Sequence, residues 1–531
     1  MTINHNQRVG VQNLVPKPTP VPLERESARR PHTLSLLSTI GQMISDGIDR
    51  FRGTTLKTKI IRGTAALSVG AVAERGVRLV RNMVLARILA PDQFGPMAII
   101  MAVSLALEAF TEVGIKQSVI QNERGSDPNY LNVAWWMQTV RGLIIFLAAA
   151  FAAPWASSFY GRQDLARLLQ VSLLSIVFMG LVSPRAYILE REYQFGRRVL
   201  LVQGSTILGT LITVALAFVL RNVWALVIGF VSESAILCIL SYILVPYRPR
   251  FEIDRACLSE LLRFARGMFG LPILTVVATK TDIIVLGKMV PDEQLGMYSL
   301  AFALAHTPIM LFAQIFNPMI LPTFARQQTD TELLAQTVLR ATQLVAVLTL
   351  PLIAFMTSCS SGILQIIYVP QYVAVAVPFG ILCLLIFTWT EGVILGSVYM
   401  AVGKPELHRR FVILRAAIIV SLIYPAIIFA KLEGAAAVLV LASLVALWRQ
   451  VFWCQRIINF KTLDYLRCFV PGLFLGLAVL AAVNSLRLLG ISSNQTMLIA
   501  GILISAAVFL AGLWILKRTG TSCWIQKENP Q

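Results

Sequence analysis

The sequence predicts an all-α integral membrane protein of about fourteen transmembrane helices, arranged as two pseudo-symmetric six-helix bundles followed by two additional helices. Three observations predict this fold. The 531 residues are 56% hydrophobic and only 14% charged, whereas soluble domains carry about 25% charged residues. Long apolar runs recur from about residue 62 to residue 517. Lys and Arg gather in alternate gaps between these runs, and an internal repeat divides the helices into two sets.

The apolar runs have the length that a bilayer requires, since a spanning helix needs about 20 mainly apolar residues. The first run is the least hydrophobic of the set. By this rule the predicted spans lie near residues 62–89, 94–118, 129–153, 164–189, 196–220, 222–246, 258–286, 294–321, 333–357, 372–402, 405–430, 434–457, 466–487 and 496–517.

The distribution of basic residues predicts the orientation. Cytoplasmic loops of membrane proteins carry an excess of Lys and Arg. If the basic N-terminal tail is cytoplasmic, the predicted inner loops are rich in Lys and Arg and the predicted outer loops contain few. The outer loop 358–371 contains no Lys or Arg. An even number of spans with both termini in the cytoplasm satisfies this alternation. The inner loops carry Arg191, Arg197, Arg198, Arg248, Arg250, Arg255, Lys404, Arg409, Arg410, Arg456, Lys461 and Arg467.

These signals divide the chain into five segments. Residues 1–56 mix proline with charge, which predicts a disordered basic cytoplasmic tail. Apolar residues from Leu34 to Phe51 recur at helical spacing, which fits an amphipathic helix lying on the membrane or a loosely ordered tail. The other predicted segments are the N-terminal six-helix bundle 57–250, the C-terminal six-helix bundle 251–460, two additional transmembrane helices in 461–519 and a cytoplasmic tail 520–531.

Composition argues against several function classes. The net charge of +19 sits in short gaps between apolar runs, not on one basic face, so we expect no nucleic-acid partner. The seven cysteines and four histidines form no metal-ligand or redox spacing, and we expect neither metal nor cofactor. The predicted loops are too short for a catalytic domain, and the sequence holds no GxxxxGK[ST] phosphate-binding loop. We therefore expect that the protein is not an enzyme.

Two short segments repeat at the predicted outer surface. Residues 84–97 read VLARILAPDQFGPM, and residues 285–297 read VLGKMVPDEQLGM. In both, a basic residue follows the valine by three positions, then come Pro-Asp and a glycine eleven positions after the valine. The first copy joins spans one and two, and the second joins spans seven and eight. An offset of six spans is what two parallel, pseudo-symmetric bundles produce.

The chain resembles the polysaccharide transporters of the MOP exporter superfamily. The residues that carry the resemblance are LARILAPDQFGPMAI, EVGIKQSVIQ, the second-half segment DIIVLGKMVPDEQLGMYSLA and the Gln371-Tyr372 region. Within that superfamily it is most similar to lipopolysaccharide, exopolysaccharide and O-antigen flippases. The resemblance covers about residues 57 to 517. It implies alternating access, placement in the bacterial inner membrane, and a polysaccharide polymerase and a chain-length regulator as companions.

Charged residues within spans are costly, at about 2.5–3.5 kcal/mol each on insertion scales, and usually mark functional sites. The first span either lines a wet cavity or places its arginines at the cytoplasmic surface. Arginine suits the pyrophosphate of a lipid-linked oligosaccharide because its planar donors match phosphate oxygens. The predicted substrate-binding residues are Arg78, Arg81, Arg141, Lys280 and Arg415, and the predicted ion-coupling residues are Glu74, Glu233 and Asp282.

Further intramembrane candidates are Glu108, His306 and Glu391. Lys280 and Asp282 stand two positions apart and point to different sides of a helix, so we expect them not to pair. The sequence leaves the driving force open among protons, sodium and membrane potential.

The expected function is a flippase that carries a polyprenyl-pyrophosphate-linked oligosaccharide from the cytoplasmic to the periplasmic leaflet for cell-surface polysaccharide biosynthesis. Its partners would be that lipid and the surrounding membrane lipids. The alternatives are a multidrug or cation antiporter, or a lipid II flippase, of the same superfamily. A structural membrane protein is a third class, which the repeat and the deep charges disfavour.

Overall fold

The computed structural model describes residues 56–111, 114–192, 194–268, 271–488 and 494–518, and every element in these ranges is a helix. From Lys59 onward the chain forms one compact unit. The predicted tails, including the amphipathic segment from Leu34 to Phe51, lie outside the described residues. The α-helices of the first half are α2 (Leu56–Ile88), α3 (Phe94–Thr111), α4 (Ile115–Gln121), α5 (Pro128–Tyr160), α6 (Leu165–Ser172), α7 (Leu174–Leu181), α8 (Arg185–Arg191), α9 (Phe195–Leu220) and α10 (Val223–Leu244).

Short 3₁₀ turns η1 (Pro91–Gln93) and η2 (Glu123–Ser126) lie between these helices. The second half contains α11 (Arg255–Met268), α12 (Leu271–Met289), α13 (Asp292–Arg326), α14 (Thr331–Ser358), α15 (Ser360–Ile367), η3 (Pro370–Val375), α16 (Ala376–Cys383), α17 (Leu385–Ala401), α18 (Pro405–Ile458), α19 (Thr462–Arg467), α20 (Val470–Leu488) and α21 (Asn494–Arg518).

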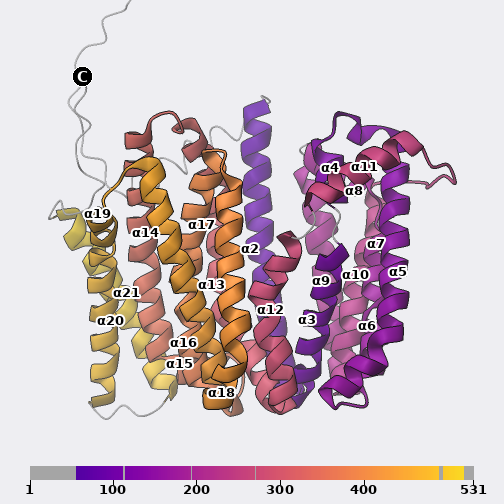
Figure 1. Cartoon of the computed structure of the whole chain (residues 1–531). Helices are drawn as coiled ribbons and strands as arrows, with labels where there is room; N and C mark the ends of the chain where they lie inside the picture. Colours follow the sequence, from indigo (N-terminus) through magenta and orange to yellow (C-terminus); the bar gives the residue numbers. More distant parts are fainter. Residues whose placement is uncertain (1–55, 112–113, 193, 269–270, 489–493, 519–531) are drawn as a thin grey trace, which may run out of the picture. The chain divides into compact units, whose positions relative to one another are not determined.

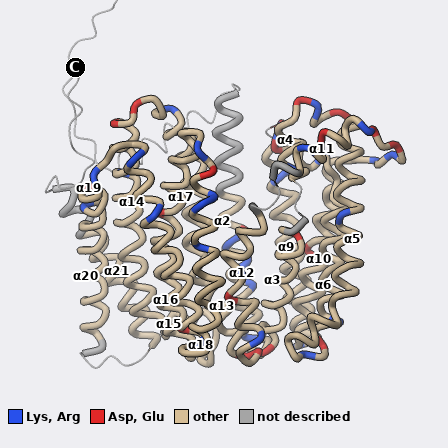
Figure 2. The backbone as a smooth tube through the Cα atoms, viewed as in Figure 1, with Lys and Arg blue, Asp and Glu red and all other residues tan. Residues whose placement is uncertain are grey.

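The helices are those of a multi-pass membrane protein. Among the described residues, nine helices are long and apolar enough to cross a bilayer, or ten if the bent α6–α8 segment is one span. Figure 2 shows charged residues concentrated toward the two ends of the helices, with fewer between. The predicted number of fourteen is not established by these criteria, because they count α18 once and leave out α2, α3 and α12.

Most predicted spans match helices within a few residues, but the second, seventh, eleventh and twelfth differ. The second span does not reach residue 118, because α3 ends at Thr111 and α4 is a separate helix. The seventh span does not begin at residue 258, because a separate amphipathic helix, α11, precedes α12. Cys257 and Leu261 of α11 are buried against Val119 and Tyr130 at one end of the molecule. α18 runs through both the eleventh and twelfth predicted spans, but its backbone breaks at Ala430 and Lys431, where the sequence predicts a turn.

Helix packing occurs mainly among neighbours of the same half, with α3 as a link between halves. α9 packs on α10 and α5 on α7, while α13 and α18 both pack on α17, and α14 packs on α20. α3 packs on both α12 and α13. Figure 1 shows α2 running between the helices that precede α11 and those that follow α12.

The two copies of the sequence repeat meet face to face at one end of the helices. A Cβ atom on Gly95 would lie 2.4 Å from the Asp292 carbonyl oxygen, and one on Gly296 would lie 2.0 Å from the Pro91 carbonyl oxygen. Real Cβ atoms essentially never come within 3.0 Å of another heavy atom. Each glycine therefore allows the other copy's backbone to approach, and the contact is reciprocal, as a pseudo-twofold relation between the copies requires.

The basic residues of the repeat play matching roles. Arg87 donates to the Ile366 carbonyl at 2.8 Å, in the last turn of α15. Lys288 donates to the Phe159 carbonyl, in the last turn of α5. Carbonyls in a last helical turn have no partner within the helix, and a nearby cation satisfies them. The basic residue of each copy thus caps a helix C-terminus. The two copies therefore share a hydrogen-bonding role as well as a sequence pattern.

Candidate functional site

Two helices bring together four of the predicted charged residues, which we call the paired cluster: Glu74, Arg78 and Arg81 of α2, and Glu233 of α10. Arg78 pairs with Glu74, one helical turn away, at 3.0 Å, and with Glu233 at 2.7 Å. Arg81 lies 3.8 Å from the other oxygen of Glu233. With both carboxylates ionised the paired cluster carries no net charge.

Residues of α9 complete this cluster. Thr206 donates to Glu233 at 3.0 Å and accepts from Arg78 at 3.3 Å, and Gln203 donates to Glu74 at 3.4 Å. Gly209 permits the arrangement, because a Cβ there would lie 2.7 Å from the Glu233 Cβ. The absence of a side chain at Gly209 therefore lets α9 and α10 come close enough for Glu233 to reach α2.

A second group, which we call the cation–aromatic row, crosses α12, α13, α17 and α18. The Lys280 ammonium lies 5.8 Å from the centre of the Phe302 ring, which stacks on His306 at 5.6 Å. His306 meets the edge of Trp389 at 4.9 Å, and the Arg415 guanidinium lies 4.7 Å from the Trp389 ring. Such contacts hold a cation in place by about 0.5–2 kcal/mol without neutralising its charge.

The charges of Arg75, Lys280 and Arg415 all act on the His306 ring. Arg75 belongs to α2, so cations from both halves of the chain converge here. None of the three forms an ion pair with a carboxylate of the described residues. We call Arg75, Lys280 and Arg415 the open cations, to distinguish them from Arg78 and Arg81 of the paired cluster.

Asp282 is completely buried and accepts a hydrogen bond from Tyr298 of α13 at 3.1 Å. It makes no ion pair with Lys280 within the described structure, as their spacing predicts. It lies inside α12, seven residues before the helix ends at Met289. Within the described structure Asp282 thus forms no ion pair with the paired cluster or with the open cations.

Arg141 lies on α5, which packs against α6, α7 and α11. Its charge acts on Tyr187 of α8, and it is not among the cations that act on His306. The structure therefore groups Lys280 with Arg415, and Arg78 with Arg81, but places Arg141 apart from both groups.

Glu391 is a buried carboxylate that the sequence marks only as a further candidate. It is completely buried in α17 and accepts hydrogen bonds from Thr342 of α14 at 2.6 Å and Tyr465 of α19 at 2.9 Å. Both donors reach the same oxygen, and the other oxygen, Oε2, has no hydrogen-bond partner in the described structure. A buried carboxylate with one unsatisfied oxygen is typical of a site that accepts a proton or a cation.

Among the described residues, no group of three or more His, Cys, Asp or Glu side chains could hold a metal ion.

A family model described as polysaccharide biosynthesis protein matches residues 84–377, more than half of the chain. The chain belongs to this family. Curated proteins similar to this chain include the lipopolysaccharide biosynthesis protein WzxC of Escherichia coli, which is 22% identical over 67% of this chain and 73% of that protein. The amylovoran biosynthesis protein AmsL of Erwinia amylovora is 23% identical over 69% of this chain and 94% of its own length. The succinoglycan biosynthesis transport protein ExoT of Rhizobium meliloti is 24% identical over 58% of this chain and 62% of its own length.

Two solved structures share the fold of this chain. The lipid II flippase MurJ, in its inward closed conformation, aligns with a TM-score of 0.72 over 85% of this chain and 99% of that one, at 15% identity. An inward-facing multidrug resistance MATE transporter of the MOP superfamily aligns with a TM-score of 0.58 over 78% and 98%. The resemblance predicted from the sequence is confirmed at the level of family and fold.

Proposed function

We propose that the protein is a flippase that moves a polyprenyl-pyrophosphate-linked oligosaccharide from the cytoplasmic to the periplasmic leaflet by alternating access. The observation that carries this proposal is the cation–aromatic row, in which Lys280 lies over Phe302 and Arg415 over Trp389 with no ion-pair partner among the described residues. A pyrophosphate is strongly hydrated and cannot enter hydrocarbon unaided. Cations held by aromatic rings, with no carboxylate partner, offer it replacement contacts.

The proposed topology has fourteen spans in two six-helix bundles plus two helices, with both termini in the cytoplasm of a bacterial inner membrane. The reciprocal contact of Gly95 and Gly296 with the opposite repeat supports pseudo-symmetric halves. The break at Lys431 supports two spans within α18, because Gly434 packs on the Ala426 carbonyl across it. In this orientation the repeat contact closes the periplasmic end.

The paired cluster supplies a way to couple transport to protons. Protonation of Glu233 or Glu74 would remove a partner of Arg78 and leave Arg78 and Arg81 available to the pyrophosphate. Deprotonation would restore the ion pairs and expel the anion. Asp282 remains a proposed coupling residue through its contact with Tyr298. Arg141 remains a proposed contact elsewhere on the path, and a polymerase and chain-length regulator remain proposed partners.

The alternatives make different demands on the same residues. A cation antiporter needs acidic groups open to its substrate, whereas the open cations would repel a cationic drug. A lipid II flippase would use the same cations for the same pyrophosphate. It is the second candidate function because the fold is similar to that of the lipid II flippase MurJ.

The experiment that tests the proposal replaces the open cations. A variant carrying Arg75→Gln, Lys280→Gln and Arg415→Gln should fold and insert but fail to deliver lipid-linked oligosaccharide to the periplasmic leaflet. If cells lacking the protein instead accumulate lipid II, the second candidate holds. If they gain only sensitivity to cationic drugs, the antiporter holds.

A further inference from the structure

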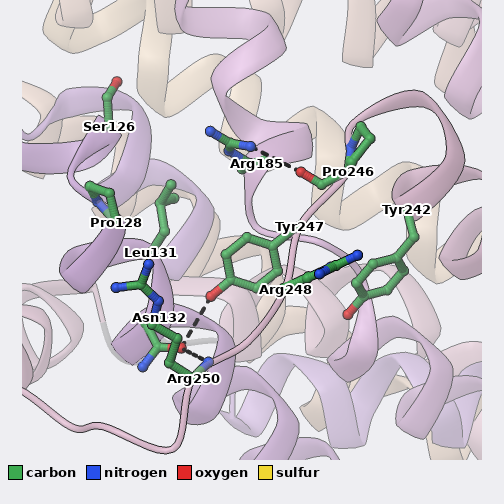
Figure 3. A pocket seen from close by; sticks show the side chains of 10 residues that line it. All are labelled: Ser126, Pro128, Leu131, Asn132, Arg185, Tyr242, Pro246, Tyr247, Arg248 and Arg250. Atoms are coloured by element: carbon green, nitrogen blue, oxygen red, sulfur yellow. Dashed lines mark hydrogen bonds between the residues drawn. The ribbon is translucent and has the colours of Figure 1, made fainter.

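A cavity of about 680 Å³ lies at the end of the molecule that holds α4, α8 and α11. Side chains from η2, α5, α8, α10 and the connection between α10 and α11 line it. Figure 3 shows three arginines at this cavity, Arg185, Arg248 and Arg250, together with Tyr242 and Tyr247. Its lining contains no Asp or Glu. The charged residues of the lining are therefore all arginines.

Buried hydrogen bonds hold the frame of the cavity. The Asn132 side chain is 4% exposed, and its oxygen accepts from the Arg250 backbone N–H at 2.7 Å and from the Tyr247 hydroxyl at 3.3 Å. Arg185 donates to the Pro246 carbonyl at 2.9 Å. The dashed lines in Figure 3 mark these contacts. They fix the connection after α10 across the ends of α5 and α8, so the cavity is formed by the fold.

The cationic groups of this cavity are available to a ligand. Within the described structure the guanidinium groups of Arg248 and Arg250 make no hydrogen bond and no ion pair, and both residues are exposed. Burial raises the pKa of the Tyr247 phenol to about 12, so its ring stays neutral beside Arg185 and Arg250. Unengaged guanidinium groups beside neutral polar rings suit phosphate, whose oxygens accept paired donors.

The cavity adjoins the lipid-facing side of the protein. Trp136, one turn along α5 from Asn132, donates to the Arg250 carbonyl at 2.8 Å, and its ring lies 5.4 Å from that of Phe251. The Phe251 side chain is 92% exposed. Farther along α5 an apolar face continues through the exposed residues Ile144, Leu147, Phe151 and Trp155. Aromatic residues at the end of such a face mark the level of lipid headgroups.

We propose that this cavity binds the phosphate headgroup of an anionic phospholipid in the adjacent leaflet, which is the cytoplasmic leaflet in the proposed orientation. Basic pockets between helices on this side are suited to such headgroups. The acyl chains would lie along the apolar face of α5, below Trp136 and Phe251. This site is separate from the open cations, and the inference does not rest on the proposed transport function.

The test uses the purified full-length protein and measures bound phosphatidylglycerol by native mass spectrometry. The variant Arg248→Gln/Arg250→Gln removes two charges and leaves the Arg185 and Asn132 contacts intact. The matched control, Arg197→Gln/Arg263→Gln, removes two exposed charges at the same end outside the lining. We expect the first variant to lose about tenfold or more in affinity and the control to lose little. Phosphatidylcholine and glycerol 3-phosphate should bind weakly to the unmodified protein.

Each other outcome overturns the proposal. Equal loss in the control would mean that the lipid is attracted only by net charge. Equal binding of glycerol 3-phosphate would assign the cavity to a soluble anion. Binding of a polyprenyl phosphate without phosphatidylglycerol would assign it to the transported lipid. None of these outcomes depends on transport, so failure here leaves the flippase proposal untouched.

Discussion

The contact between the two repeat segments gives the sharpest mechanical prediction. Gly95→Ala and Gly296→Ala each place a methyl group against the backbone of the opposite copy, 2.4 Å and 2.0 Å from a carbonyl oxygen. A backbone cannot move aside as a flexible side chain can. The two segments must therefore separate, or the helices that carry them, α3 and α13, must shift.

The size of the effect follows from the cost of overpacking, which is typically about 1–3 kcal/mol per site. Free energies of this size shift a two-state equilibrium by about 5-fold to 150-fold. If the repeat contact closes the periplasmic end, each substitution should raise the population open at that end by this factor. The clash at Gly296 is the tighter of the two, so Gly296→Ala should have the larger effect.

The assay measures the distance between spin labels at Asp92 and Glu293, both exposed and one in each repeat segment. In a cysteine-free background the unmodified protein should give mainly the short distance, and the alanine variants should populate a longer one. Gly76→Ala and Gly392→Ala are matched controls, because a Cβ at either glycine meets nothing within 4 Å. Unchanged distances and unchanged thermal stability in Gly296→Ala would refute this account of the repeat contact.

Three further predictions concern single interactions. Arg78→Gln should lower the free energy of unfolding by about 1–3 kcal/mol, because it leaves Glu74 without an ion-pair partner and Glu233 with only Arg81 at 3.8 Å. Thermal unfolding measures this loss, and the added change Glu233→Gln should recover part of it. Tyr465→Phe should lower the free energy of unfolding by about 1 kcal/mol or more, because it removes a hydrogen-bond donor to buried Glu391. Tyr424→Phe, at an exposed residue, should lower it little. Equal melting temperatures for the two variants would contradict the role given to Tyr465. Arg141→Ala should abolish transport in cells at unchanged protein level, and normal transport would remove Arg141 from the proposed path.

Much of the fold can be predicted from the sequence because a bilayer imposes one strong rule, the length of an apolar helix. α9, α10, α13 and α14 match their predicted spans within a few residues. The rule fails at α11, where Leu258, Leu261 and Leu262 extend an apolar pattern into a helix that also carries Glu260 and Arg263. Spacing alone does not separate an amphipathic helix from the start of a span.

The repeat could be predicted in register, since its two glycines stand at equivalent positions, but the face-to-face contact of its copies could not. Its capping contacts could not, because Ile366 and Phe159 are far from Arg87 and Lys288 in the sequence.

The charges of the site could be listed from the sequence but not paired. Only Glu74 and Arg78 lie one helical turn apart, and the sequence marks that pair. Arg78 and Glu233 are 155 residues apart, and their contact depends on Gly209 bringing α9 close to α10. The cation–aromatic row draws on four helices, so Phe302 and Trp389 carry no local signal beyond the spacing of Phe302 and His306 at i, i+4.

The most direct measurement is the distribution of lipid-linked oligosaccharide between the two leaflets of the inner membrane. Cells that lack the native protein would carry either the unmodified chain or the Arg75→Gln/Lys280→Gln/Arg415→Gln variant, with Arg197→Gln/Arg255→Gln/Arg263→Gln as the control of equal charge. The account predicts that the lipid-linked sugar remains on the cytoplasmic side only in cells carrying the Arg75→Gln/Lys280→Gln/Arg415→Gln variant. Normal appearance of the sugar on the periplasmic side in cells carrying that variant would contradict the claim that the open cations bind the pyrophosphate.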